Sequence, residues 1–349
     1  METFKAHRLS LVTEVKRTIE LNEHQGSAIR GALFHAMRAR FCGNKEAGEC
    51  AACPLVTTCP VATLLSTLKP GSGRGRDVPR PYTVQPPLPG AGHAMEDERG
   101  RFFFHYRPGE RLAFGITLYA QALQLFPYVV LTIRTFEKSG LGRRMERRQG
   151  QWRRGTLAVQ HIWAENPLTG KRHGVLDAGD DTVQVPDVPI THQQVLDTSR
   201  RLLSTMEGGR ITLNFLTPTR LVAGGELVKP HTFHFKPLLQ RLLDRLEALS
   251  RDFSATKLCV DFSGLVSASE NVRVVDNRLL WEELRSYSTR RRTDSPTSGL
   301  LGTVTLEADD WGTFLPFLVW GQFTHVGKDA VKGNGAYQIA PHRGQFSTR

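Results

Sequence analysis

Cysteines form the densest group of reactive side chains in this sequence. Four of the five, Cys42, Cys50, Cys53 and Cys59, fall within "CGNKEAGECAACPLVTTC". A Cys-x-x-Cys pair lets two thiolates bind one ion, and the other two cysteines complete a tetrahedral site. We therefore expect structural zinc here, with an iron–sulfur cluster or unliganded thiols as alternatives. Four thiolates leave no open coordination position, so a catalytic metal is not expected.

A glycine-rich stretch near the carboxyl terminus, "THVGKDAVKGNGAYQI" (residues 324–339), has the composition of a phosphate-binding loop. Its glycines and lysines are Gly327, Lys328, Lys332, Gly333 and Gly335. Glycines allow backbone amides to approach a phosphate closely, and lysines add charge that a plain turn does not need. The lysine-serine/threonine pair of a nucleotide-binding P-loop is absent. We therefore expect this loop to contact a nucleic-acid backbone rather than a nucleotide.

Arginines supply most of the positive charge of this 349-residue chain, whose net charge is +12. The clusters comprise Arg143, Arg144, Arg147, Arg148, Arg153 and Arg154 after a Gly-Leu-Gly sequence, and Arg290, Arg291 and Arg292 after Tyr287. A guanidinium group matches phosphate oxygens in shape and charge. Tyr287 or Trp152 could stack on a splayed base. This pattern favours a nucleic-acid partner, the alternative being a basic enzyme with a solvated charged surface.

Hydrophobic periodicity indicates the elements that must position these groups. In the first half it predicts a strand over residues 8–21, a helix in "GSAIRGALFHAMRARFC" capped by Ser27, a loop over 69–92, two strands joined by Pro108–Gly109, and a helix over 119–140. From Arg210 it predicts a strand, an amphipathic helix, two strands, a second helix and a short last strand.

Both halves thus show the strand and helix order of a split βαβ unit. We predict an α+β protein with two tandem ferredoxin-like (RRM-like) domains. The first spans residues 1–200 and carries the cysteine-rich metal-binding insertion (42–60), and the second spans 201–349 and carries the glycine-rich loop. No apolar run approaches the ~20 residues that span a bilayer, and the start lacks a secretory signal, so we expect a cytoplasmic protein without membrane contact.

Five patches resemble a known family: the CRISPR-associated endoribonucleases of the RAMP superfamily, which process precursor CRISPR RNA. The patches are "HQGSAIRGALFHAMRARFC" with the cysteines after it, "RITLNFLTPTRL", "WEELRSYSTRRR", "SGLLGTVTL" and "FLPFLVWGQFTHVGKDAVKGNGAYQI". The resemblance implies metal-independent cleavage within CRISPR repeats by 2′-hydroxyl attack, giving 2′,3′-cyclic phosphate and 5′-hydroxyl ends. It also implies retention of the processed crRNA and association with other effector subunits. Lys332 and Asn334 replace the usual apolar residues of the final glycine motif.

The resemblance also selects the candidate catalytic residues. His35 lies on the first predicted helix, where the family's catalytic histidine is often found, with Arg30 and Arg38 nearby to stabilise phosphate. A histidine pKa near ~6.5 suits both proton acceptance and donation. Its alternative role is packing at the helix edge. His325 is the second candidate, with loop shaping as its alternative, and His24 is the third. A noncatalytic RNA-binding RAMP subunit remains the competing function.

Overall fold

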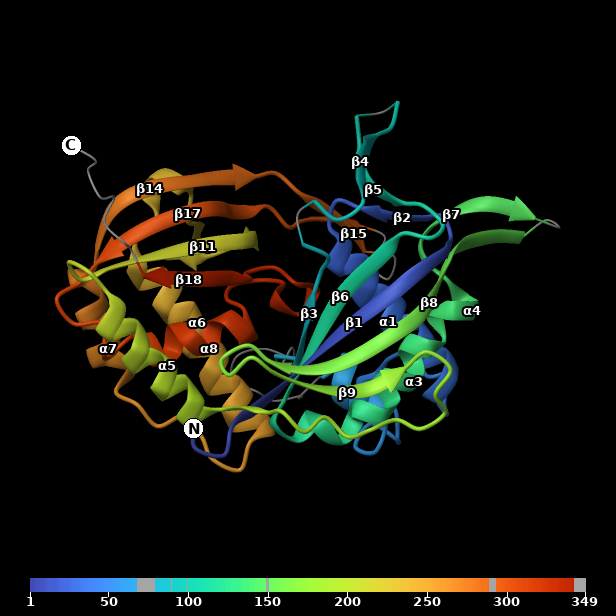
Figure 1. Cartoon of the computed structure of the whole chain (residues 1–349), viewed down its shortest axis with the longest axis horizontal. Helices are drawn as coiled ribbons and strands as arrows, with labels where there is room; N and C mark the ends of the chain where they lie inside the picture. The colour runs from blue at the N-terminus through green and yellow to red at the C-terminus, as the bar shows by residue number, and fades with distance from the viewer. Residues whose placement is uncertain (68–78, 89, 99, 149–150, 289–292, 342–349) are drawn as a thin grey trace. The chain divides into compact units, whose positions relative to one another are not determined.

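A computed structural model describes the chain except residues 68–78, 89, 99, 149–150, 289–292 and 342–349. The chain forms two compact units. We call residues 6–189 the amino-terminal unit, and residues 1–5 with 190–349 the carboxyl-terminal unit. Both mix helices with antiparallel sheets, so the predicted α+β class is confirmed (Figure 1). The units divide between Pro189 and Ile190, whereas the predicted domain boundary lies between residues 200 and 201.

The amino-terminal unit contains a large antiparallel sheet and a small one. The large sheet follows the order β3 (Tyr82–Gln85), β6 (Arg111–Tyr119), β1 (Lys5–Arg17), β8 (Gln151–Asn166) and β7 (Leu141–Arg148), and β9 (Lys171–Asp177) also pairs with β8. The small sheet follows the order β2 (Ile19–Asn22), β5 (Phe102–Tyr106) and β4 (His93–Glu96). Side chains alternate across each strand, and Leu9, Leu11 and Val15 of β1 are fully buried as expected.

The helices of this unit are α1 (Gln25–Phe41), α2 (Pro60–Leu65), α3 (Phe126–Arg134) and α4 (Phe136–Ser139), with 3₁₀ turns η1 (Cys50–Ala52) and η2 (Ala120–Leu125). The predicted helix over 119–140 is therefore interrupted. Pro127 stands in the first turn of α3, where its missing amide is tolerated, and this is why a new helix begins there. Helix α1 begins at Gln25 with His24 as its N-cap, so the predicted cap at Ser27 is wrong.

Two strand predictions of the first half need correction. The strand predicted over 8–21 is divided between the two sheets, because β1 ends at Arg17 and β2 begins at Ile19. Pro108–Gly109 joins two strands as predicted, although β5 belongs to the small sheet and β6 to the large one. Strand β3 lies inside the segment predicted as a loop, where it pairs with β6. Periodicity indicates that a segment is extended, but it does not identify the partner strand.

The carboxyl-terminal unit is built on one four-stranded antiparallel sheet. Its order is β14 (Arg273–Glu282), β17 (Gly299–Glu307), β11 (Arg210–Thr219) and β18 (Tyr337–Pro341). The unit also contains short strands. These are β10 (Ile190–Thr191), β12 (Val222–Ala223) paired with β13 (Glu226–Leu227), and β15 (Arg285–Ser288) paired with β16 (Thr293–Pro296). The elements β11, α6, β14, β17, α8 and β18 follow one another in the order that periodicity predicts.

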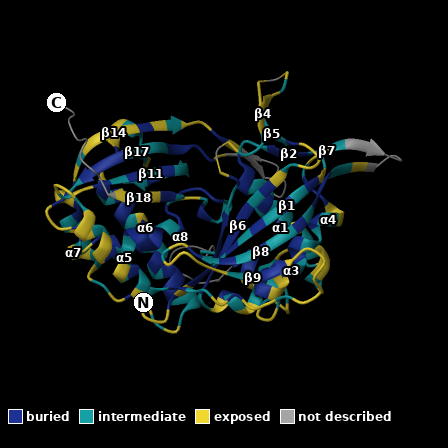
Figure 2. Cartoon of the chain, in the orientation of Figure 1, coloured by how far each residue is buried: buried dark blue, intermediate teal, exposed yellow. Residues whose placement is uncertain are grey.

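Helices pack against this sheet and close its core. They are α5 (His192–Thr205), α6 (Phe235–Phe253), α7 (Phe262–Ala268) and α8 (Leu315–Thr324), with 3₁₀ turns η3 (Pro230–Thr232), η4 (Ser269–Asn271) and η5 (Ala330–Lys332). Leu238, Leu242, Leu246 and Leu249 recur at helical spacing on α6 and are fully buried (Figure 2). Among the described residues, no helix is both long and apolar enough to cross a membrane.

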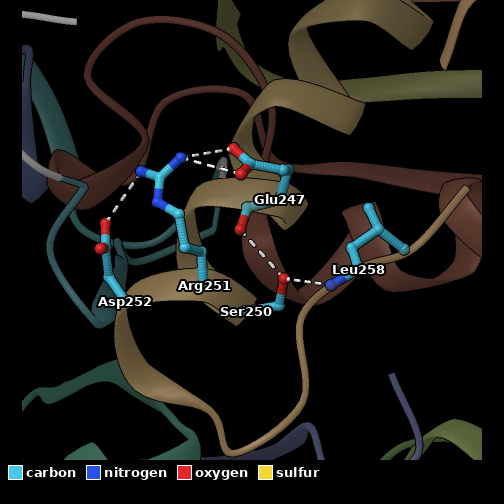
Figure 3. Close-up of polar contacts among 5 residues, drawn as sticks. All are labelled: Glu247, Ser250, Arg251, Asp252 and Leu258. Atoms are coloured by element: carbon cyan, nitrogen blue, oxygen red, sulfur yellow. Dashed lines mark hydrogen bonds and ion pairs between the residues drawn. The ribbon is translucent and has the colours of Figure 1, made fainter. Parts of the chain in front are cut away.

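Polar contacts hold the end of α6 (Figure 3). Arg251 donates from Nη1 to both carboxylate oxygens of Glu247 at 2.8 and 2.9 Å, and from Nη2 to Asp252 at 3.1 Å. Ser250 Oγ donates to the Glu247 carbonyl at 2.9 Å and accepts from the Leu258 amide at 2.9 Å. These contacts join the end of α6 to the segment that follows it.

Candidate functional site

Helix α1 presents His35 on a face that does not pack into the core. Ile29, Leu33 and Met37 are fully buried at successive turns of the helix and anchor it. His35 lies outside that stripe and its side chain is exposed. The Phe34 ring contacts the imidazole edge-on, with centroids 5.6 Å apart. The helix therefore holds His35 firmly while leaving it open to a ligand.

Two predicted arginines of α1 are tethered to backbone carbonyls beside it. Arg30 donates from Nη2 to the Leu65 carbonyl at 3.3 Å, and its Cζ lies 5.5 Å from the Phe34 ring centroid. Arg38 donates from Nη2 to the Lys45 carbonyl at 3.0 Å. Each of these bonds uses one of the five guanidinium N–H groups.

Strands β7 and β8 bring a third arginine to His35. Arg154 donates from Nη1 to the Gly142 carbonyl at 2.6 Å. Two glycines let β7 and β8 lie close to the backbone at Thr18 and Glu20. A Cβ at Gly142 would overlap the Glu20 carbonyl, and a Cβ at Gly155 would overlap the Thr18 carbonyl. Strand β7 thus begins within the Gly-Leu-Gly sequence, at Leu141, and the second glycine, Gly142, lies against the β2 backbone.

The electrostatics of this group follow from the crowding of cations. Partial desolvation, followed by the positive charges of Arg154, Arg30 and Arg38, lowers the pKa of His35 from its ordinary value. Desolvation and the charge of Arg144 also lower the pKa of Arg154. His35 is consequently a neutral imidazole at neutral pH. The three guanidinium groups around it form a site suited to an anion, and we call these four residues the His35 cluster.

The rest of the first arginine cluster lies along the same two strands. Arg143 contacts Glu20 across 3.4 Å, and its Cζ lies 5.6 Å from the Phe103 ring centroid. Arg144 is exposed and pairs by backbone with Arg154. The β7 and β8 backbones continue this pairing through Arg147, Arg148, Trp152 and Arg153. Trp152 is 56% exposed.

Only Tyr287 of the second cluster, Tyr287 with Arg290–Arg292, lies among the described residues. Tyr287 lies on β15, where its backbone pairs with Asp294. The predicted RNA-binding residues Arg290 and Arg291 lie outside the described residues, as does Arg292.

The glycines of the carboxyl-terminal loop serve close backbone approach within the protein. A Cβ at Gly335 would overlap the Val326 carbonyl, and one at Gly327 would lie 2.5 Å from the Arg220 carbonyl oxygen. The Gly335 amide donates to the Pro218 carbonyl at 3.1 Å, and the Gly333 amide donates within the loop. The amides of Gly335 and Gly333 are thus already hydrogen-bonded within the protein. The structure therefore favours a packing role for these two glycines over direct phosphate contact.

The two lysines of the loop differ. Lys332 is 2.9 Å from Asp329 in an ion pair. Lys328 donates its amide to the Arg220 carbonyl at 3.0 Å, and its side chain is exposed. Of the two, the Lys328 ammonium is the group better placed to meet a phosphate.

His325 occupies a different environment from His35. Its side chain is 1% exposed and its φ is +59°, and its amide donates to the Gly321 carbonyl at 2.8 Å to end α8. A side chain this deeply buried does not meet RNA as it lies, which favours loop shaping over catalysis. His24, the third candidate, is also buried, at 5% exposure.

The four clustered cysteines lie between the end of α1 and the start of α2. Cys42, Cys50, Cys53 and Cys59 are all partly exposed free thiols. Across the part of the chain that the structure describes, no group of three or more His, Cys, Asp or Glu side chains is placed to hold a metal ion. Zinc and an iron–sulfur cluster therefore both stay predictions from the cysteine spacing.

Comparison with known proteins decides the family. Residues 4–188, more than half of the chain, match AF_1859_N, an N-terminal domain model, and residues 213–337 match the model of the CRISPR-associated endoribonuclease Cas6. Residues 213–337 thus match the CRISPR-associated Cas6 family. The resemblance carried by the sequence patches is thus confirmed. No curated protein sequence gives a significant match.

Solved Cas6 structures share the fold. A Cas6-RT-Cas1–Cas2 complex chain superposes with a TM-score of 0.59 at 12% identity, and a Cas6 product complex of the Thermus thermophilus protein with 0.51 at 13%. The alignments cover 97% and 96% of this chain, and 46% and 100% of the other chains. A second Cas6-RT-Cas1–Cas2 structure gives a TM-score of 0.59, and there the chain spans 29% of the length of the structure it matches.

Sequence reasoning found the members of the His35 cluster but not their arrangement. His35, Arg30 and Arg38 are visible on one predicted helix, whereas Arg154 appeared only as one of six arginines. Glu20 and Phe103, which hold Arg143, were missed. The signal for Phe103 in the sequence is the alternation of "RFFFHY", which places Phe103 and His105 on one side of a strand.

Proposed function

We propose that this protein is a metal-independent endoribonuclease that cleaves precursor CRISPR RNA within its repeats. The observation that carries the proposal is the His35 cluster: one exposed, neutral imidazole among the guanidinium groups of Arg30, Arg38 and Arg154. Metal-free RNA cleavage needs a base for the 2′-hydroxyl and cations for the charge that grows on phosphorus. The cluster offers both without a metal ion.

The proposed reaction proceeds by attack of the 2′-oxygen on the adjacent phosphorus. The neutral imidazole of His35 accepts the 2′-hydroxyl proton as the new P–O bond forms, and the P–O5′ bond breaks. The leaving 5′-oxygen takes a proton from water. Water can reach this position because the His35 side chain is exposed to solvent. Arg30, Arg38 and Arg154 stabilise the negative charge on the nonbridging oxygens. The products are a 2′,3′-cyclic phosphate and a 5′-hydroxyl.

Binding of the RNA is proposed to use the arginines of β7 and β8 with the Lys328 side chain. Basic groups spread over successive positions can neutralise successive phosphates, which supports retention of the processed crRNA after cleavage. The arrangement β14, β17, β11 and β18 supports a ferredoxin-like origin for the carboxyl-terminal unit. Similar chains in Cas6-RT-Cas1–Cas2 complexes make CRISPR proteins the proposed protein partners.

The test is cleavage of end-labelled repeat RNA in excess EDTA, together with a substrate that carries a 2′-deoxy group at the cut site. We expect cleavage of the first and none of the second. His35→Ala should abolish cleavage while keeping RNA binding. His161→Ala is the matched control, because His161 lies seven residues beyond Arg154 on β8, roughly 23 Å along the strand. Tight binding by the wild type without cleavage would instead establish the noncatalytic RNA-binding subunit.

A further inference from the structure

The small sheet of the amino-terminal unit has one face that packs inward and one that does not. On the inward face, Ile19 and Leu21 of β2 and Tyr106 of β5 are fully buried. Tyr106 Oη also donates to Gln25 at 2.7 Å, which ties the central strand to α1. The sheet is therefore anchored from one side and rigid enough to present the other.

The outer face carries Phe103 and His105 with the side chains that lie opposite them on the two neighbouring strands. Phe103 of the central strand β5 lies opposite Asn22 of β2 and Met95 of β4, and His105 lies opposite Glu20 and His93. Since side chains alternate across a strand, these six residues share one face. We call it the Phe103 face.

The Phe103 face is open to solvent. Phe103 and His105 are partly exposed, and Met95 is 44% exposed. Strand β4 is exposed along its whole length, and β4 and β5 project beyond the large sheet of this unit (Figures 1 and 2). Two aromatic side chains two residues apart on a central strand form the type of surface on which single-stranded RNA stacks its bases.

A cation lies at the edge of this face. Arg143 is held by Glu20 at 3.4 Å with its Cζ 5.6 Å from the Phe103 ring centroid. A ring beside a guanidinium offers the two partners of a nucleotide, a stacking surface for the base and a charge for the phosphate. Arg143 also follows Gly142, whose carbonyl accepts from Arg154 of the His35 cluster. The start of β7 thus joins the Phe103 face to the His35 cluster.

We propose that the Phe103 face is a base-stacking platform for a single-stranded segment of the RNA, with Phe103 and His105 as the stacking residues. The inference rests on the proposed function, because the RNA is the one whose cleavage the His35 cluster would perform. A nucleic acid is favoured over a protein by the net charge of +12 and by the exposed arginines that flank the face.

The test measures binding of the full chain to a 20-nucleotide single-stranded RNA that carries 2-aminopurine at successive positions, one per oligonucleotide. Stacking on the platform quenches the fluorescence at one or two positions. Phe103→Leu should abolish that quenching and weaken binding by about 5- to 150-fold, the range for one lost stacked base. The slope of log Kd against log salt should stay unchanged, because no charge is lost. Arg143→Gln should lower that slope by about one.

Phe102→Leu is the matched control. Phe102 precedes Phe103 on the same strand, is 52% exposed and points to the opposite face. Its replacement should leave the affinity within twofold of wild type. Phe103→Tyr keeps the ring and should restore both affinity and quenching, which separates a stacking defect from a folding defect.

Three results would overturn the platform: wild-type affinity and quenching in Phe103→Leu, equal losses in Phe102→Leu and Phe103→Leu, or no restoration in Phe103→Tyr. The first would show that the RNA does not stack on the Phe103 face. Cleavage of repeat RNA by the same variants keeps the two proposals apart. A wild type that quenches at defined positions but does not cleave would sink the endoribonuclease and leave the platform standing.

Discussion

Gly335→Ala offers a direct test of how the glycine-rich loop is built. Gly335 has a φ of +74°, and a Cβ there would overlap the carbonyl oxygen of Val326. That carbonyl belongs to a backbone, which cannot rotate aside as a side chain would. The Gly335 carbonyl also accepts from the Val326 amide at 3.0 Å, and the Gly335 amide donates to Pro218 at 3.1 Å. The added methyl group must therefore separate two hydrogen-bonded backbone segments.

The expected loss of stability has two parts. The left-handed conformation costs an L-residue about 1–2 kcal/mol. Loss or distortion of two buried backbone hydrogen bonds adds about 1 kcal/mol each, and more where a buried group is left unpaired. Gly335→Ala should thus lower the free energy of unfolding by about 3–4 kcal/mol. Gly225→Ala is the matched control, because Gly225 has a φ of +89° and no atom within 4 Å of the added Cβ, so it incurs only the conformational cost.

The assay is thermal unfolding of both variants beside the wild type, with RNA binding measured at low temperature. At about 2–4 °C per kcal/mol, Gly335→Ala should lower Tm by about 10 °C and Gly225→Ala by about 4 °C. A Gly335→Ala variant as stable as Gly225→Ala but with much weaker RNA binding would refute the packing role. It would restore the loop as a direct phosphate clamp.

Three further predictions follow from single contacts. Arg38→Gln removes a cation that lowers the pKa of His35, so the pKa rises and the acid limb of the cleavage pH profile moves to higher pH; an unmoved limb would separate His35 from the rate. Tyr337→Phe removes a buried hydroxyl that donates to the Leu318 carbonyl at 2.7 Å and should cost about 1 kcal/mol in chemical denaturation, with unchanged RNA affinity. The cysteine spacing predicts about one zinc per chain by elemental analysis, lost in Cys53→Ser; metal-free protein of full activity would contradict it.

Local patterns were enough to predict the four-stranded sheet of the carboxyl-terminal unit with α6 and α8, but α5 and α7 were not predicted. The leucine stripe of α6 and the order of β11, α6, β14, β17, α8 and β18 follow from periodicity alone, since each element buries one face against a single sheet. The sheet membership of the strands in the amino-terminal unit could not be predicted, for a physical reason. Its chain passes between two sheets at Thr18 and again near Pro108–Gly109, and an alternating pattern looks the same whichever sheet it joins.

The same limit applies to the candidate site. His35 and Arg38 are three residues apart on one helix, so helical spacing brings these two side chains together before any fold is known. Arg154 reaches them only because Gly142 and Gly155 let β7 and β8 lie against the backbone at Thr18 and Glu20. These glycines are therefore as necessary to the His35 cluster as its cations. A side chain at either position would move Arg154 and Arg143 together, so the anion site and the Phe103 face should lose RNA binding jointly while α1 stays intact.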